Sequence, residues 1–252
     1  MQTIMSRGKR YEIPENIDEL SPAQYERLLI IYLACIDGYL DERQARRRLL
    51  SFFIGMEDYT ILLPEYREEL DSSLPLLDPF FDSRGLPAIS TVRNLLPEYK
   101  GYVGPKDSLA GFPFGKFIEA LTVLYELSAA EEDEEISAGL DHVARVFYSI
   151  PEDKEVPLLL RLHAPRLLEA VWKMIREQPV MINGALIDFG IIFRSSGGAS
   201  GPDDHTGWTG ILFEVAEKGL FGSVEKVEQT DMWAVLLYLY KCKFEYLHQK
   251  TE

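Results

Sequence analysis

The feature that most constrains this fold is a run of apolar residues at helical spacing directly behind a helix-start signal. Ser21-Pro22-Ala23-Gln24 forms a capping box, with a hydroxyl at the N-cap, proline at the first helical position and glutamine at the third. This spacing predicts a helix over 21–36 with one buried face, and Gly38 is suited to end it. The buried face would contain Tyr25, Leu28, Leu29, Tyr32, Leu33 and Ile36.

Similar start signals and helical apolar spacing recur along the chain. A second helix is predicted from Asp41, with Gln44 three residues on, to Gly55. Others are predicted near Glu65–Leu70, over Phe114–Leu127 and Ser137–Tyr148, after Pro165 and over Trp208–Ala216, with Glu131–Glu135 as a solvated acidic turn. Thr230 is predicted to cap a last helix, whose buried face would contain Trp233, Leu236, Leu237, Tyr240, Phe244 and Leu247. The chain is therefore expected to be mainly α, with a multi-helix bundle-like domain.

Two stretches interrupt this pattern. Between Leu74 and Pro113, frequent prolines exclude long regular elements, yet the apolar content predicts an ordered irregular segment clamped on the helical core. Within 180–193, Asn183-Gly184 stands between apolar triplets, which predicts either one short β-hairpin or a turn between two short helices. The predicted organisation is an N-terminal arm (1–20), a helical region (21–150, including 74–113) and a C-terminal helical region (151–252), unless the last two form one continuous domain.

Composition narrows the functional classes. The formal net charge is −15, so the chain repels phosphate backbones at long range and nucleic-acid binding is disfavoured. We expect a cytoplasmic protein, because the sequence contains neither the apolar core of a signal peptide nor a run approaching the roughly 20 apolar residues of a membrane span. The two cysteines, Cys35 and Cys242, lie in apolar helical patterns, which predicts buried free thiols.

Three patterns in the sequence resemble sites that carry chemistry. The loop over 197–202 resembles a nucleophile elbow, but Pro202 stands where that motif needs glycine, and the loop has no Gly-Lys-Ser/Thr ending for phosphates. Asp203, Asp204 and His205 are adjacent, so their side chains diverge rather than converge on a metal, and a helix cap before Trp208 is favoured. No two of the four histidines are spaced as a helical zinc pair. We therefore predict no catalytic, cofactor-binding or metal-ligating residue.

Partner binding is the remaining hypothesis for specific residues. Arg43, Arg46 and Arg47 concentrate positive charge on the second predicted helix, and three interpretations stay open: nucleic-acid contact, a protein partner, or a solvated face with internal ion pairs. The irregular segment adds Phe80, Phe81 and Tyr99 as candidate partner contacts, because long ordered loops are often functional.

The C-terminal third has the most individual pattern. It reads Gly207-Trp208, Ile211-Leu212, Val215-Ala216, Gly219, Phe221-Gly222, Val224 and Val227 before the aromatic last helix, and related packing patterns occur at Phe114-x-x-Phe117 and over 140–148. In these motifs the chain resembles helical proteins from the tail-assembly gene clusters of tailed phages and prophages. The resemblance implies a non-enzymatic assembly protein of the bacterial host cytoplasm or the virion, such as a tail-assembly chaperone, which binds other phage structural proteins.

Two further functions stay open at this point. One is a structural virion component, such as a neck or connector subunit, which predicts a ring-like oligomer. The other is an enzyme whose residues assemble only in three dimensions, for which Asp203, His205 and Glu214 would be candidates.

Overall fold

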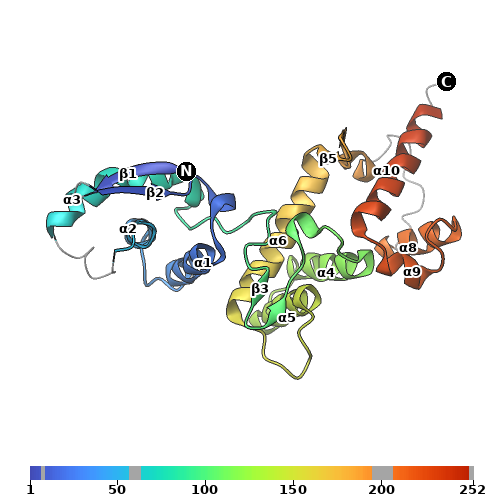
Figure 1. The fold of residues 1–252 in the computed structure, drawn as a ribbon. Coiled ribbons are helices and arrows are strands. Elements are labelled where there is room, and N and C mark those ends of the chain that lie inside the picture. Colours follow the sequence, from blue (N-terminus) through green and yellow to red (C-terminus); the bar gives the residue numbers. More distant parts are fainter. Residues whose placement is uncertain (7–8, 57–63, 195–206, 250–252) are drawn as a thin grey trace.

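A computed structural model describes residues 1–6, 9–56, 64–194 and 207–249. The structure is 60% helical, and the strands of the described residues form three separate two-stranded antiparallel sheets. Figure 1 shows the elements in three groups that follow one another along the molecule: β1 to α3, then α4 to α6, then β5 to α10. The mainly α, multi-helix prediction is therefore confirmed.

The N-terminal group opens with a hairpin that the sequence did not predict. Strands β1 (Gln2–Ser6) and β2 (Lys9–Ile13) pair antiparallel, and Ile4 and Ile13 are buried beneath them. The 3-10 helix η1 (Ile17–Glu19) leads into the helices. The expected arm over 1–20 thus contains a hairpin of its own, and Ile13 anchors it to the core.

The first two helices follow their sequence signals closely. Helices α1 (Pro22–Ile36) and α2 (Glu42–Phe53) both begin with complete capping boxes, at Ser21 and Asp41. The chain leaves them through Gly38 and Gly55, whose φ angles of 74° and 67° lie in the left-handed region that glycine tolerates best. The predicted buried face of α1 stops before its last residue, because Ile36 is exposed.

The proline-rich segment is ordered and irregular, as predicted. After α3 (Pro64–Ser73) come the 3-10 helix η3 (Leu74–Phe80), the short strands β3 (Glu98–Tyr99) and β4 (Tyr102–Val103), and the 3-10 helix η4 (Asp107–Leu109). Lys100 and Gly101 both have positive φ angles, which fits the tight turn between β3 and β4. The segment is held by buried apolar side chains, including Leu77, Phe80, Ile89, Leu95, Leu96, Leu109 and Phe112.

The middle group consists of α4 (Phe114–Leu127), α5 (Asp133–Tyr148) and α6 (Leu158–Glu177). The bounds predicted for α4 are confirmed. The acidic turn predicted over Glu131–Glu135 is wrong, because α5 already begins at Asp133, where carboxylates at a helix N-terminus interact favourably with its dipole. Helices α5 and α6 pack against each other across residue 150, where the sequence suggested a domain boundary.

Pro165 does not segment the chain as the sequence suggested. It lies inside α6 and is buried there, between Ala164 and the buried Leu167 and Leu168. A proline in a helix interior costs about 3 kcal/mol, because it lacks an N–H donor and crowds the preceding turn. Burial of apolar side chains along this helix offsets that cost.

The C-terminal group contains β5 (Val180–Ile182), β6 (Ala185–Ile187), α7 (Gly190–Phe193), α8 (Gly207–Glu217), α9 (Val224–Gln229) and α10 (Met232–Gln249). The hairpin alternative for Asn183-Gly184 is confirmed, with both residues at positive φ. The predicted cap of the last helix was wrong by one residue: Asp231 accepts the hydrogen bond from the Trp233 N–H, while Thr230 ends α9.

An aromatic cluster joins the middle and C-terminal groups. The Trp172 ring of α6 lies 6.1 Å from Phe117, 4.9 Å from Phe193 and 6.0 Å from Trp208, measured between ring centroids. The backbone adds a clip, because the Phe114 N–H donates to the Thr230 carbonyl at 2.8 Å. The N-terminal end of α10 is therefore fixed against α4.

A buried polar network joins the N-terminal and middle groups. His163 of α6 is fully buried; its Nδ1 lies 2.9 Å from the Tyr25 hydroxyl of α1, and its Nε2 lies 2.8 Å from Oδ1 of Asn94. Asn94 donates to the Pro105 carbonyl and accepts from the Leu96 N–H, which fixes its amide orientation. Because Asn94 Oδ1 can only accept, neutral His163 carries its proton on Nε2.

Burial is the main cause of the pKa shifts of the ionisable side chains in this network. It lowers the pKa of His163 to about 3 and raises the pKa values of Tyr25 and Tyr148, whose hydroxyl donates to the Leu96 carbonyl. All three side chains are therefore neutral at pH 7. Each has a hydrogen-bond partner, which is what a buried polar group requires to avoid a large desolvation penalty.

Candidate functional site

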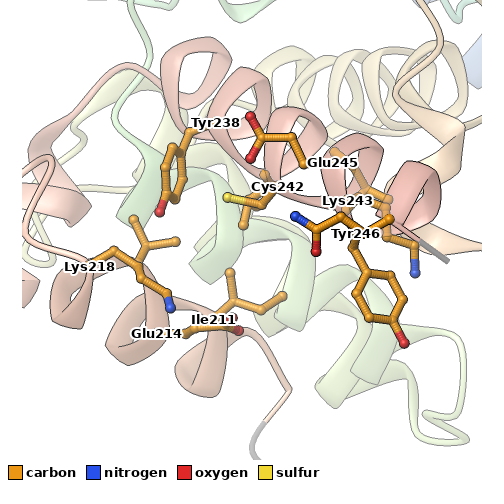
Figure 2. Close-up of a pocket in the computed structure, with 12 residues that line it drawn as sticks. Ile211, Glu214, Lys218, Tyr238, Cys242, Lys243, Glu245 and Tyr246 are labelled. Atoms are coloured by element: carbon orange, nitrogen blue, oxygen red, sulfur yellow. The ribbon is translucent and has the colours of Figure 1, made fainter. Parts of the chain in front are cut away.

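The most distinctive open feature is a groove between α8 and α10, which we call the C-terminal groove. It encloses about 510 Å³, and Figure 2 shows side chains of the two helices facing the same space. Helix α8 contributes Ile211, Glu214, Val215 and Lys218, and α10 contributes Tyr238, Leu239, Cys242, Lys243, Glu245, Tyr246 and Gln249, with Ile192 of α7. This volume lies in the range of known ligand-binding pockets.

The charges of the C-terminal groove are balanced. Glu214 and Glu245 oppose Lys218 and Lys243 among the lining residues. The pKa of Tyr238 is raised, first by its contact with the Cys242 side chain one turn along α10, then by burial and by the two glutamates. The Tyr238 hydroxyl is therefore protonated at neutral pH and able to donate a hydrogen bond to an occupant.

On the face of α10 that points away from the groove lies an aromatic stripe made of Tyr240, Phe244 and His248, none of which lines the groove. The Tyr240 and Phe244 rings are stacked with centroids 5.8 Å apart, and the His248 ring follows at 4.0 Å. Phe244 is 43% exposed, so the predicted buried face of the last helix continues beyond the part that the core covers. Exposed aromatic side chains on a rigid helix are typical of protein interfaces.

More apolar side chains are exposed in the same group of elements. Phe213 of α8 is 61% exposed and Leu220, which follows α8, is 64% exposed. On the β5–β6 hairpin, Met181 and Leu186 stand directly opposite each other, and both are exposed. The C-terminal group therefore presents several apolar side chains to solvent in addition to those that line the groove.

The three arginines of the predicted cluster form ion pairs with acidic residues of the same chain. Arg47 forms a bidentate pair with Asp71 at 2.7 and 2.8 Å, and Arg43 bonds the same carboxylate. Arg46 pairs with Asp78 at 2.7 Å and with Glu42 at 2.8 Å. The geometry thus follows the internal ion-pair alternative for all three arginines, and binding of a partner there stays a prediction.

The aromatic candidates of the irregular segment lie mostly in the core. Phe80 is fully buried, and Phe81 is 8% exposed with the Arg46 guanidinium 4.4 Å from its ring centroid. A partner could not reach Phe80 without opening the packing around η3. Tyr99 is half-buried, and burial is the first cause of its raised pKa. The structure does not bring these residues together with the C-terminal groove.

The histidines and cysteines considered in the sequence lie at separate places in the structure. His142 pairs with Glu119 at 2.9 Å on the surface, and His163 belongs to the buried network. The prediction that Cys242 is buried was wrong, because it is exposed at the groove, while Cys35 is half-buried. Lys241 and Lys243, which flank Cys242 in the sequence, are the signal that this part of the helix faces water. The loop over 195–206, with Asp203, Asp204 and His205, lies outside the described residues.

The described residues offer neither a metal-binding cluster nor a membrane-spanning helix. No group of three or more His, Cys, Asp or Glu side chains is placed there to hold a metal ion. No helix in the same part of the chain is long and apolar enough to cross a membrane.

The fold and the groove together define a mainly α protein with an open, helix-lined groove and with exposed aromatic side chains on the helices that form it. Comparison of the chain with protein-family models, with curated proteins and with solved structures finds no match.

Proposed function

We propose that this chain is a non-enzymatic protein-binding protein that holds a partner around the C-terminal end of α10, which carries the C-terminal groove on one face and the aromatic stripe on the other. The observation that carries the proposal is the exposure of aromatic side chains on both faces of this end of α10, with Phe244 of the stripe 43% exposed and Tyr246 of the groove 45% exposed. Leaving such side chains in water forfeits the roughly 1.5–3 kcal/mol that burial of each would contribute. A partner that covers them recovers this free energy.

The particular role follows the sequence resemblance. We propose an assembly protein of a tailed phage or prophage, acting as a tail-assembly chaperone on other phage structural proteins. A chaperone of this kind needs an exposed apolar surface that is held rigid, because a rigid surface loses little conformational entropy on binding. The clip between α4 and α10 and the aromatic cluster around Trp172 supply that rigidity.

The test is co-purification with the tail-tube and tape-measure proteins encoded near this gene. We expect a complex with the wild type, and loss of most binding when Phe244 and Tyr246 are both replaced by alanine. The matched control is Tyr39→Ala, since Tyr39 is 79% exposed and lies between α1 and α2, far from the groove.

Three outcomes would count against this proposal. Absence of binding to those proteins would remove the chaperone role. Equal binding by the double variant and the Tyr39→Ala control would remove the C-terminal end of α10 as the binding site. A stable ring-like oligomer in light scattering would favour a neck or connector subunit instead.

A further inference from the structure

A second groove runs along α4, on a surface that the proposed function does not use. It consists of two adjoining hollows of about 620 and 630 Å³. The first lies between α4, α8 and α9, the second between α4 and α5, and both are lined by Val123 and Glu126. From Gly115 to Leu127, α4 follows this groove for about 18 Å at 1.5 Å per residue.

Close helix packing shapes the two ends of the groove. A Cβ atom at Gly115 would lie 2.8 Å from Cβ of Glu228, so the start of α4 approaches α9 at a distance that only glycine permits. At the other end, a Cβ atom at Gly139 of α5 would lie 2.5 Å from a methyl carbon of Leu127. The groove is therefore part of the packed helical framework.

The rim of the groove is strongly acidic. Glu119, Glu126, Glu135 and Glu228 line it, against Lys116 as the one lysine or arginine of its described lining. The C-terminal groove has two glutamates and two lysines, so acidity is a property of the α4 groove rather than of every hollow in this acidic chain.

Most of these carboxylates lack a counter-charge. Glu119 pairs with His142, whereas Glu126, Glu135 and Glu228 form no ion pair with any residue that the structure describes. All four are exposed. Like charges that line one groove without cations between them repel each other, and an occupant that brings positive charge relieves that repulsion.

We propose that the α4 groove binds an amphipathic α-helix of another protein whose polar flanks carry lysine or arginine. The length of the groove matches about twelve residues of helix, and its floor offers apolar side chains such as Ile118, Val123 and Leu127. Cations on either flank of the bound helix face Glu119 and Glu228 on one side and Glu126 and Glu135 along the other hollow. Charge complementarity of this kind determines which helix is accepted and speeds its association.

The test uses two fluorescently labelled amphipathic peptides of about fifteen residues, with leucine at helical spacing and either lysine or glutamate at the flanking positions. Fluorescence anisotropy measures their binding to the full chain. We expect the lysine peptide to bind, the glutamate peptide to bind at least about tenfold more weakly, and the affinity for the lysine peptide to fall as salt is raised.

Variants locate the binding surface. Glu126→Lys with Glu228→Lys reverses two groove charges, and both positions lie near helix C-termini, where lysine is favoured. We expect about tenfold weaker binding of the lysine peptide by this double variant. The matched control, Glu98→Lys with Glu152→Lys, changes the net charge equally at exposed positions outside the groove and is expected to stay within about twofold of the wild type.

Equal weakening by the two double variants, or equal binding of the two peptides, would overturn the proposal. The proposal would also be overturned if sedimentation showed that the wild type is a dimer and that the groove variant is a monomer. A second copy of this chain would then be the occupant of the groove. None of these substitutions alters the C-terminal groove, so the two proposals succeed or fail separately.

Discussion

Lowering the pH from 7.5 to 5.0 is expected to destabilise this protein through His163. The folded state keeps the imidazole neutral, because burial lowers its pKa to about 3, while the unfolded chain takes up a proton near pH 6.5. Below pH 6.5 the unfolded state therefore binds one more proton than the folded state. Stability then falls with decreasing pH by about 1.4 kcal/mol per unit.

The magnitude follows from the unfolded pKa, because the folded pKa lies well below this range. Between pH 7.5 and 5.0 the loss is about 2 kcal/mol. With a urea m-value of about 2.5 kcal/mol/M, the unfolding midpoint should fall by about 0.8 M. Urea titrations at half-unit pH steps, followed by circular dichroism, measure this shift.

The comparison that isolates His163 is its replacement by glutamine. Its amide can donate to Asn94, and Tyr25 can keep its hydrogen bond to the Ile89 carbonyl, so the variant should fold with a loss of about 1–3 kcal/mol at pH 7.5. In His163→Gln, the urea midpoint should fall by about 0.8 M less between pH 7.5 and 5.0 than it does in the wild type. In His142→Gln, which changes a surface histidine, the midpoint should fall as much as in the wild type. An unchanged pH dependence in His163→Gln would refute this account of the buried network.

Three further perturbations test other parts of the framework. Gly104→Ala places a methyl group 2.5 Å from the buried Tyr148 ring, so thermal unfolding should show a loss of about 1–3 kcal/mol; an unchanged melting temperature would contradict the packing described. Asp71→Asn removes the carboxylate whose pKa Arg47 lowers, so its urea midpoint should be reduced at pH 7; the difference from wild type should shrink as the pH falls below about 4, where the unfolded carboxylate takes up a proton while the paired native carboxylate still resists protonation. Ile13→Ala should cost about 2–5 kcal/mol if the N-terminal hairpin belongs to the core, and a loss below about 0.5 kcal/mol would make the hairpin peripheral.

The sequence predicted helices well where local signals agree with each other. At 21–36 the capping box, the apolar spacing and a terminal glycine all indicate one element, and α1 forms there. The α5 start was placed too late, since the run from Glu131 to Glu135 can be either a solvated turn or a favourable helix N-terminus. Only the packing of α5 on α4 and α6 decides between them.

The missed features depend on contacts far apart in the sequence. Strands β1 and β2 are joined by Arg7-Gly8, which is not one of the strong hairpin signals. The grooves beside α4 and α10 are spaces between helices, so no residue pattern within one helix could locate them. Phe244 shows the limit most clearly: its spacing predicted a buried face, but exposure depends on whether another element covers that end of α10.

The hydrogen bond between Tyr25 and His163 has a consequence for how the chain is made. The two residues are 138 positions apart, so α1 has left the ribosome long before its buried partner has been synthesised. At 5–20 residues per second the interval is about 7–28 s, during which the Tyr25 hydroxyl and the apolar surface around it lack their native neighbours. We therefore expect chains arrested before residue 163 to carry an undocked N-terminal region that proteases cut, and chains extended past α6 to resist them.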